Sequence, residues 1–315
     1  IASGGNYNTV VGDEAGTALT TGDNNVAVGH TAGDAMTTAS ENTAVGSKSL
    51  SGVTTGNSNT GVGAFAGLSI TTGTNNVAVG PYALTTMTTS DYNTAVGRAA
   101  GRYITTGFDN TLIGGLAGDA LTDADYNTAI GKEALTSDTL GSRSTAVGWS
   151  ALANQNFTSA TNSYNTAMGF QAGLSVTTGT TNTLIGGLSG DAITTASSNT
   201  AVGYSSLGVN TTGAFNTAIG YASLDANTTA DNNTAVGYNS LGLNTTGTRN
   251  TGLGNNTLQA NTTANNNTAL GYNAMALNTT GASNTAIGKD ALDANTTASN
   301  NVAVGYASLE ANTTG

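Results

Sequence analysis

The sequence contains no cysteine, one proline and one histidine among its 315 residues. Without cysteine the chain has no disulfide bond, no thiolate metal site and no cysteine nucleophile. Because His30 is the lone imidazole, a Ser-His-Asp arrangement cannot recur along the chain. The adjacent acids Asp13 and Glu14 would point to opposite faces of a strand, which is poor geometry for a catalytic pair. We therefore expect no enzymatic activity and no cofactor in this segment.

Basic residues are also scarce, with seven Lys and Arg against eighteen Asp and Glu and a net charge of −11. This balance leaves no basic patch for nucleic acid or for anionic lipid. Charged residues make up only 8% of the chain, which is too few for charge-driven disorder. No apolar run approaches the roughly 20 residues that a membrane-spanning helix needs. We expect neither nucleic-acid binding nor membrane insertion.

Glycine, asparagine and threonine are abundant instead, and they recur in a fixed order. The motif Asn-Thr-Ala-Val-Gly returns with a seventeen-residue period and conservative substitutions. Its starts lie at residues 8, 25, 42, 59, 76, 93, 110, 127, 144, 165, 182, 199, 216, 233, 250, 267, 284 and 301. Asn occupies each start except Ser144, and the step from Ser144 to Asn165 is longer than the others by four positions. A fixed short period predicts units that stack on one another and cannot bury an apolar face alone.

The composition of the repeat decides between helix and strand. Thr, Asn and Gly fill most positions and no apolar stripe of helical period persists, so a helical array is excluded. The Asn-Gly and Asp-Gly signals of tight hairpins are absent, which argues against an antiparallel meander. We predict an all-β fold, a parallel β-solenoid (β-roll) of eighteen 17-residue repeats. One array would span residues 1–315 as a fragment of a longer fibre. Residues 144–164 would form an enlarged repeat with a four-residue insertion, looping outward within 154–162.

Side chains within one repeat can be assigned to faces by alternation. With positions numbered from the Asn, position 2 is Thr or Val and position 4 is always a large aliphatic residue. Both lie on one side of a short strand, and position 3, usually Ala, points to the opposite side. We expect position 3 to form the outer face, where Leu112 and Leu184 show that bulk is tolerated. The predicted structural ladder is represented by Asn233, Val236, Gly237, Leu241 and Asn244.

Three of these ladder positions have specific roles. Stacked Asn side chains should bond along the axis. The Gly at position 5, invariant in all eighteen repeats, indicates a positive φ or a close backbone approach. Positions 9 and 12 vary together. In early repeats position 9 is Gly and position 12 is aliphatic, whereas in later repeats position 9 is aliphatic and position 12 is Asn. One large apolar group per coil, supplied from either position, would conserve the core volume.

Several surface features are candidates for binding. Position 10 carries acids that could hold Ca²⁺ or simply be solvated: Asp34, Asp119, Asp191, Asp225, Asp293 and Glu310. Position 6 carries an aromatic stripe suited to glycan binding or to packing between chains: Tyr204, Tyr221, Tyr238, Tyr272 and Tyr306. Paired threonines at positions 13 and 14 invite comparison with ice-binding solenoids, and a turn bonded by hydroxyls is the alternative. Asn210-Thr211-Thr212 and its successors also match a glycosylation acceptor.

The motif resembles a known family of fibres. Asn-Val-Ala-Val-Gly, as in residues 25–29 and 301–305, resembles the head repeats of YadA-type trimeric autotransporter adhesins. The longer form in residues 233–247 is similar to the repetitive shafts of tail-fibre proteins. The resemblance implies a left-handed β-roll of three chains side by side, and it carries over no binding residue.

These observations together predict a structural function. We expect a non-enzymatic shaft of an extracellular or virion fibre, exposed at a cell surface or on a virion, with adhesion at a tip outside this segment. A thin core indicates self-association, as a homotrimer. The alternative is a surface-binding module in which the face of the rod itself adheres to a glycan receptor or, as a weaker option, to ice.

Overall fold

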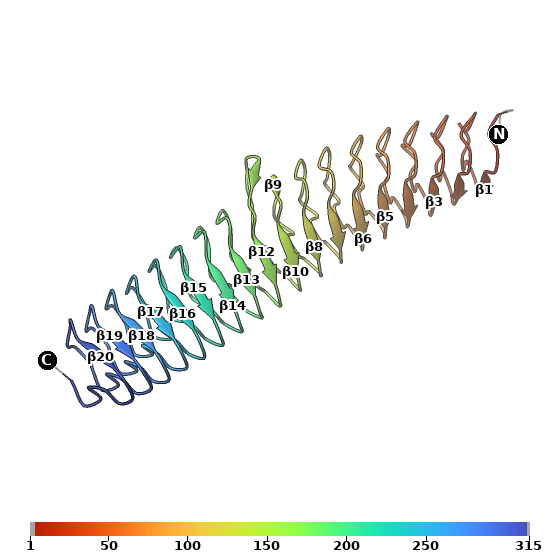
Figure 1. The fold of residues 1–315 in the computed structure, drawn as a ribbon. Helices are drawn as coiled ribbons and strands as arrows, with labels where there is room; N and C mark the ends of the chain where they lie inside the picture. The colour runs from red at the N-terminus through yellow and green to blue at the C-terminus, as the bar shows by residue number, and fades with distance from the viewer. Residues whose placement is uncertain (1–3, 314–315) are drawn as a thin grey trace. The chain divides into compact units, whose positions relative to one another are not determined.

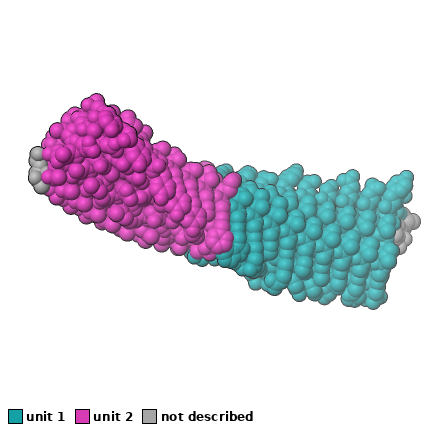
Figure 2. Space-filling model, turned by 90° about the horizontal axis from the view of Figure 1, so that it is seen from below, with its two compact units in different colours: residues 1–163 teal, residues 164–315 magenta. Residues whose placement is uncertain are grey.

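The computed structural model describes residues 4–313, and within them it contains strands and turns but no helix. The chain divides into two compact units, Ile1–Ser163 and Tyr164–Gly315 (Figure 2). Both are built from the same element, a short strand at positions 2–4 of each repeat. The predicted all-β parallel β-solenoid is confirmed.

Each unit contains nine of these short strands (Figure 1). In the first unit they are β1 (Thr9–Val11), β2 (Val26–Val28), β3 (Thr43–Val45), β4 (Thr60–Val62), β5 (Val77–Val79), β6 (Thr94–Val96), β7 (Thr111–Ile113), β8 (Thr128–Ile130) and β10 (Thr145–Val147). In the second they are β12 (Thr166–Met168), β13 (Thr183–Ile185), β14 (Thr200–Val202), β15 (Thr217–Ile219), β16 (Thr234–Val236), β17 (Thr251–Leu253), β18 (Thr268–Leu270), β19 (Thr285–Ile287) and β20 (Val302–Val304). A further pair, β9 (Gly141–Ser142) and β11 (Thr161–Asn162), lies in the first unit.

Successive strands within each unit pair in parallel and in register. Thr217 lies opposite Thr234 and Ile219 lies opposite Val236 in the pairing of β15 with β16. A shift of one coil therefore places every strand residue over its equivalent in the next repeat. This register follows from the sequence, because any slip would bring a strand residue opposite a Gly or an Asn of the turn.

The asparagine at position 1 joins neighbouring coils from inside. Oδ1 of Asn233 accepts the backbone N–H of Asn250 at 2.9 Å, and its Nδ2 donates to the carbonyl of Gly247 at 2.8 Å. The same pair of bonds recurs throughout both units, and Asn233 is fully buried. One amide thus ties a coil to the next and closes its own coil. Only a carboxamide offers an acceptor and a donor in this short geometry, so the predicted axial ladder of Asn side chains is confirmed.

The second unit contains another buried ladder of amides at position 12. Asn244 Nδ2 donates to Asn227 Oδ1 at 3.1 Å, and Asn261 Nδ2 donates to Asn244 Oδ1 at 2.8 Å. Asn244 also donates to the Gly247 carbonyl at 2.9 Å, so this carbonyl accepts from both ladders. The buried polar groups therefore have partners, which removes the penalty of placing amides in a core.

The prediction for the two strand faces was wrong. Ala235 at position 3 is completely buried, whereas position 4 faces outward and leaves Leu253 37% and Leu270 46% exposed. Val236 is half-buried on this outer face and does not belong to the interior ladder. The interior is narrow: a Cβ at Gly252, which also occupies position 3, would lie 2.6 Å from Ser240 Oγ. Small residues are inside because there is no room for branched ones.

The bulky exceptions at position 3 fit this corrected assignment. Leu112 and Leu184 are fully buried. Each points at the Gly of position 9 in its own repeat, since a Cβ at Gly118 would lie 2.8 Å from Leu112 and one at Gly190 would lie 2.7 Å from Leu184. Position 3 therefore shares one interior space with position 9, and a Leu in the strand requires a Gly across the coil.

Positions 9 and 12 share the same space. Where position 9 is Gly, the side chain of position 12 fills it, and a Cβ at Gly33 would lie 2.8 Å from Met36 Cε. In the second unit Leu241 at position 9 is fully buried, with Asn244 beside it in the amide ladder. Leu241 adopts a left-handed φ of 51°, which costs a branched residue some strain. Burial of the leucine offsets that strain.

The invariant glycine at position 5 has both a positive φ and a close backbone neighbour, the two conditions that its presence in every repeat suggested. Gly237 has a φ of 132°, and a Cβ there would lie 2.3 Å from the carbonyl oxygen of Gly254 in the next coil. An L-residue is disfavoured by the backbone angle and by the contact together. The strand therefore ends at this residue in each coil.

The enlarged repeat departs from the ladder at its first residue. Ser144 replaces Asn, and Gln155 Nε2 fills the vacated space by donating to Ser144 Oγ at 2.7 Å and to Asp138 Oδ2 at 2.6 Å. Ser163 Oγ lies 2.5 Å from Ser144 Oγ, and all four residues are buried. The unusual Ser is thus part of a local polar network.

The extra residues of this repeat leave the stack near its closing turn. Leu140 N donates to the carbonyl of Phe157, and Thr161 N donates to the carbonyl of Leu140. Residues 158–160 lie between these two contacts and are exposed. β9 and β11 then pair in parallel at the base of the loop, which is visible as the tallest loop in Figure 1.

Adjacent glycines provide a matched test of the position 5 requirement. Gly114 has a φ of 138° and a Cβ there would lie 2.4 Å from the Gly131 carbonyl oxygen, whereas nothing lies within 4 Å of a Cβ at Gly115. We expect Gly114→Ala to destabilise the protein by about 1–3 kcal/mol or more, and Gly115→Ala to change the stability by less than about 0.5 kcal/mol. Chemical denaturation measures both. Equal effects would show that position 5 has no special structural demand.

The shared interior space predicts a partial rescue. Leu241→Gly should cost about 2–5 kcal/mol, because it leaves a cavity. Adding Asn244→Ile should recover part of this loss, since earlier coils combine Gly with Ile in this way, as at Gly67 and Ile70. Recovery stays incomplete because the amide bonds of Asn244 are lost. Melting curves of the single variant and the double variant test this prediction. A double variant that is no more stable than Leu241→Gly alone would contradict a space shared by positions 9 and 12.

Candidate functional site

The most extensive surface feature is the outward side of the strands, which we call the outer strand face and define as positions 2 and 4 of each coil. Position 4 supplies one aliphatic side chain per coil in both units, from Val11 to Val147 and from Met168 to Val304. These side chains are half-buried or exposed. No strand residue of the described chain is charged. In each unit the face is a continuous, neutral row of Thr or Val beside Val, Ile, Leu or Met.

Sequence reasoning missed this face because it placed position 4 inside. The signal was present in the composition of the two alternating positions. Position 3 is held to Ala or Gly in nearly every repeat, whereas position 4 varies freely among Val, Ile, Leu and Met. A tight interior restricts size more strongly than an open surface does, so the more restricted position is the buried one.

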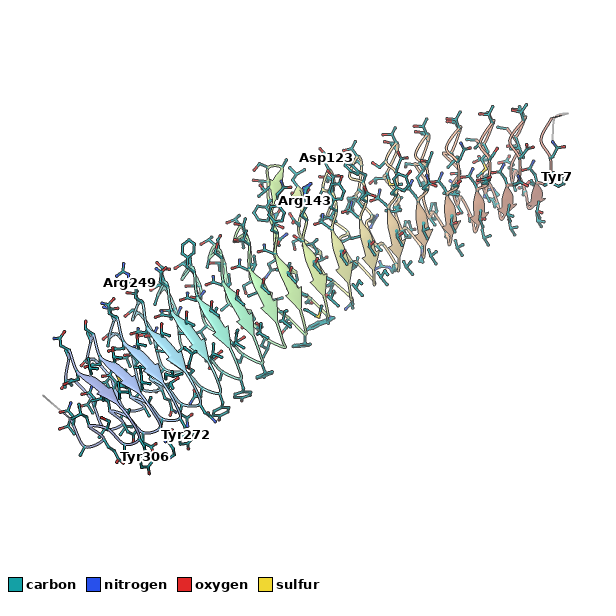
Figure 3. All side chains as sticks on the ribbon, viewed as in Figure 1. Tyr7, Asp123, Arg143, Arg249, Tyr272 and Tyr306 are labelled. Atoms are coloured by element: carbon teal, nitrogen blue, oxygen red, sulfur yellow. The ribbon has the colours of Figure 1, made fainter. Side chains whose placement is uncertain are left out.

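The tyrosine stripe at position 6 lies at the end of the strands in the second unit. Tyr204, Tyr221 and Tyr238 are about half exposed and stack on one another, with ring centroids 5.7 and 5.5 Å apart. Lys289 Nζ lies 5.8 Å from the ring centroid of Tyr272 and 5.1 Å from that of Tyr306. In Figure 3 these last two rings and Arg249 lie on opposite edges of the strand ladder.

Stacking limits what the tyrosine stripe can bind. A sugar that stacks on an aromatic ring needs a free ring face. The ring of Tyr221 has a neighbouring ring on each side, so it presents its edge and hydroxyl to solvent. The backbone of Gly187 lies close to the ring of Tyr204, since a Cβ on this glycine would be 3.5 Å from Tyr204 Cδ2. The run of three is thus better arranged for packing along the axis than for holding a glycan.

The two threonine rows differ in their bonding. At position 13 the hydroxyl donates to the backbone carbonyl of the next coil, as from Thr211 to Thr228 at 3.1 Å and from Thr228 to Thr245 at 3.2 Å. At position 14, Thr212 and Thr246 are exposed. The first row belongs to the turn bonded by hydroxyls, and only the second row faces solvent freely.

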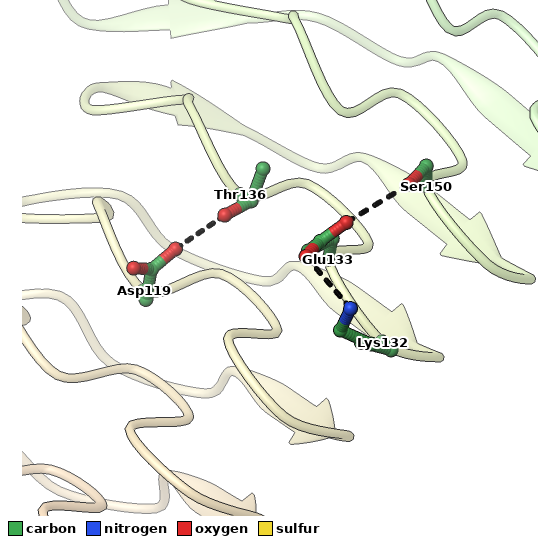
Figure 4. A network of polar contacts seen from close by, with 5 residues as sticks. All are labelled: Asp119, Lys132, Glu133, Thr136 and Ser150. Carbon is green, nitrogen blue, oxygen red and sulfur yellow. Dashed lines mark hydrogen bonds and ion pairs between the residues drawn. The ribbon is translucent and has the colours of Figure 1, made fainter.

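The acids of position 10 do not form a cation site in the part of the chain that the structure describes. No group of three or more His, Asp or Glu residues there is placed to hold a metal ion. Asp119 accepts a hydrogen bond from Thr136 at 2.5 Å, close to the Lys132–Glu133–Ser150 contacts of the next coils (Figure 4). Partial burial raises the pKa of Asp119, and the Thr136 bond opposes this effect.

Other position 10 acids share this raised pKa. Burial raises the pKa of Asp191, and the like charge of Asp225 adds to it. Burial likewise raises the pKa of Asp293, and the charges of Asp290 and Glu310 add to it. Repulsion between acids stacked along one side costs stability when they are ionised.

Two candidates for catalysis, Asp13 and His30, occupy position 6 of neighbouring coils, and Glu14 follows Asp13. His30, Asp13 and Glu14 are each exposed at turns. A separate open hollow of about 380 Å³ in the first unit is lined by Tyr92, Phe108 and turn residues of two neighbouring coils, including Asp91 and Asp109. Its lining contains neither a histidine nor a basic residue.

Comparison with known proteins leaves the function to be argued from the structure. No protein-family model matches the sequence, and no curated protein matches it. In the described residues no helix is long and apolar enough to cross a membrane.

The raised aspartate pKa values predict an unusual response to mild acid. Because these aspartates bind protons more readily in the folded chain than in the unfolded chain, the stability that they contribute is full below the ordinary value of 3.8 and is lost as the pH rises through their folded pKa. We expect the melting temperature to rise between about pH 7 and pH 4.5, and Asp191→Asn to raise it at pH 7 and to weaken this slope. A melting temperature that falls on acidification equally in both proteins would contradict the prediction.

Proposed function

We propose that this chain is the structural, non-enzymatic shaft of an extracellular or virion fibre. Adhesion would lie at a tip outside this segment, and its coils would provide length and stiffness. The resemblance to YadA-type head repeats and tail-fibre shafts supports this proposal, and it adds the expectation of a left-handed roll in a three-chain fibre.

The observation that carries the proposal is the bonding between coils. Each position 1 amide bonds to the next coil and to its own closing turn, as Asn233 does with Asn250 and Gly247. The threonine hydroxyls of position 13 add a second axial row of bonds. Each coil presents the same donors and acceptors to its neighbour as the coil before it does, so the array can continue by adding coils. This arrangement suits an elongated structural element.

The interior of the coil supports self-association. In the second unit, each coil that starts between Asn199 and Asn284 buries one large apolar side chain at position 9, such as Leu241, beside an Ala or Gly and two amides. At about 25 cal/mol per Å² of apolar area, so thin a core contributes little beyond the cost of ordering a whole coil. Partner chains of the same kind would bury the aliphatic side chains that remain outside. We therefore include a homotrimer in the proposal.

The alternative is a surface-binding module. The tyrosine stripe is its best support, but the covered faces of Tyr221 leave little for a sugar to stack on. The row of free threonines at position 14 is a single row, and ice adsorption by such a row needs a flat surface around it. These features make binding by the side of the rod a second candidate, below the shaft.

Solution size tests the shaft proposal. We expect sedimentation equilibrium to give three times the chain mass of 30.8 kDa, and electron microscopy to show thin fibres without globular domains. Incubation with glycan arrays and assay of ice-crystal growth provide the comparison for the alternative. A stable, folded monomer that binds glycan or ice would contradict the shaft and support the surface-binding module.

A further inference from the structure

The open hollow in the first unit combines two aromatic rings with two carboxyl groups. Its volume is about 380 Å³, and Asp91, Tyr92, Phe108 and Asp109 line it together with Thr and Ser residues of the same turns. The side chains of Tyr92 and Phe108 are both exposed, so their rings are accessible to solvent. The lining contains no basic residue that would neutralise the two acids. The hollow has the size of a small-molecule site.

A second turn of the same unit has the same residue pattern. Numbered from the Asn, Asp91 and Tyr92 hold positions 16 and 17 of their coil, and Asp125 and Tyr126 hold these positions two coils later. Each aspartate accepts the backbone N–H of position 16 in the preceding coil, at 2.6 and 3.0 Å. Both tyrosines have a left-handed φ, of 59° and 58°. The two turns are therefore equivalent in their backbone and in these two side chains.

The two turns differ at position 17 of the following coil. There the second turn has Arg143, whose guanidinium carbon lies 4.8 Å from the ring centroid of Tyr126, within the range of a cation–π contact. Arg143, labelled in Figure 3, also donates to Asn162 at 2.8 Å. Burial raises the pKa of Asp125, and the charge of Arg143 is among the effects that oppose it. In the first turn the corresponding residue is Asp109, so this turn has a second carboxyl group where the other has its cation.

Other rings of the first unit also have a cation of the chain above them. Lys48 Nζ lies 5.9 Å from the ring centroid of Phe65, and the guanidinium of Arg102 lies 5.4 Å from that of Tyr82. Among the residues that the structure describes, no Lys or Arg lies over Tyr92. The carboxyl group of Asp109 forms no ion pair within the same part of the chain. The turn of Tyr92 thus has the groups that attract a cation and no cation from the chain.

We propose that this hollow binds a small organic cation that carries a guanidinium or an alkylammonium group. The charged head of the ligand would lie over the ring of Tyr92, as Arg143 lies over Tyr126. The carboxylates of Asp91 and Asp109 would lie beside it and supply the opposite charge. The inference goes beyond the proposed function, since it requires neither a fibre nor a second chain.

The aromatic walls favour an organic cation over a metal ion. Hard metal ions such as Ca²⁺ need six or more oxygen ligands, and no group of three or more acids or histidines in the described chain is placed to hold one. A ring face attracts an organic cation and at the same time covers its alkyl groups. Phe108 provides a second apolar wall, and its edge-to-face contact with Tyr126, with ring centroids 5.2 Å apart, supports it from behind.

Binding of a charged probe and its neutral analogue tests the proposal. The probe is butylguanidinium chloride, and the control is butylurea, which has nearly the same shape without the charge. At an ionic strength of about 0.15 M the general attraction of a chain with a net charge of −11 is largely screened. We expect ligand-observed NMR titration to give a dissociation constant on the order of a millimolar for butylguanidinium, and binding at least about ten-fold weaker for butylurea. Equal binding of the two compounds would overturn the proposal.

Two variants and a matched control locate the bound cation. Tyr92→Leu and Asp109→Asn should each weaken butylguanidinium binding at least about five-fold, since one removes the ring face and the other a carboxylate. Glu41→Gln also removes an exposed carboxylate at position 17, but the residue before it in the row is Asn24, so binding should stay within about two-fold. An equal loss in all three variants would indicate general attraction to an acidic chain and overturn the site, as would unchanged binding by Tyr92→Leu.

Asp109→Arg provides the opposite test, because it places a guanidinium after Tyr92 as Arg143 follows Tyr126. The backbone accepts this change, since position 17 has a left-handed φ at both sites, 54° at Asp109 and 63° at Arg143. We expect the variant to melt at or above the temperature of the unchanged protein and to bind butylguanidinium at least about ten-fold more weakly. Undiminished binding by this folded variant would contradict a site over Tyr92.

A short peptide separates a free cation from a basic side chain of a protein partner. A capped pentapeptide with one central arginine among glycines should bind within about three-fold of butylguanidinium, because the hollow receives only the charged head and its alkyl chain. Binding at least about ten-fold tighter than that of butylguanidinium would assign the hollow to a peptide partner and overturn the small-ligand assignment.

Discussion

The buried carboxamide at position 1 is the interaction on which each coil depends. Its oxygen accepts the backbone N–H of the next coil and its nitrogen donates to the carbonyl that closes its own coil. A three-residue strand alone would be a weak element, because few ladder bonds hold it. The amide adds one bond along the axis and one across the coil, both in a site shielded from water, where such bonds are stronger. The rest of the coil is arranged around this side chain.

The narrow interior follows from that arrangement. Two amides and one large apolar side chain nearly fill a coil such as that of Asn233, and its strand contributes only Ala235 at position 3. Where the strand contributes Leu112, the residue across the coil is Gly118. The volume that large side chains fill inside a coil is therefore conserved, although those side chains come from position 3, 9 or 12 in different coils. The larger aliphatic residues of position 4 lie at the surface, where they form the neutral row of the outer strand face.

The coil-to-coil bonds repeat along each unit, and the outer strand face repeats with them as a neutral apolar row. Partial burial raises the pKa of Asp191 and Asp293 at position 10, and the like charges of acids in nearby coils add to it. Because each coil repeats similar side chains at the same positions, favourable and unfavourable contacts both recur from coil to coil. The enlarged coil, with Ser144 and Gln155, shows how the array accommodates a departure by building a local polar network.

The sequence by itself determined the period, the strand at positions 2–4, the parallel register and the axial amide ladder. Each follows from local chemistry that recurs in every repeat: alternation in a strand, the two-sided bonding of Asn, and a Gly that no other residue replaces. Only the tertiary structure decided which side of the strand is inside. Alternation yields two faces and does not rank them, and hydrophobicity favoured the wrong one. The ranking depends on how much space the returning chain leaves, which is set by Leu241 and the amides across the coil, and in the strand it is reflected only in the narrow size range of position 3.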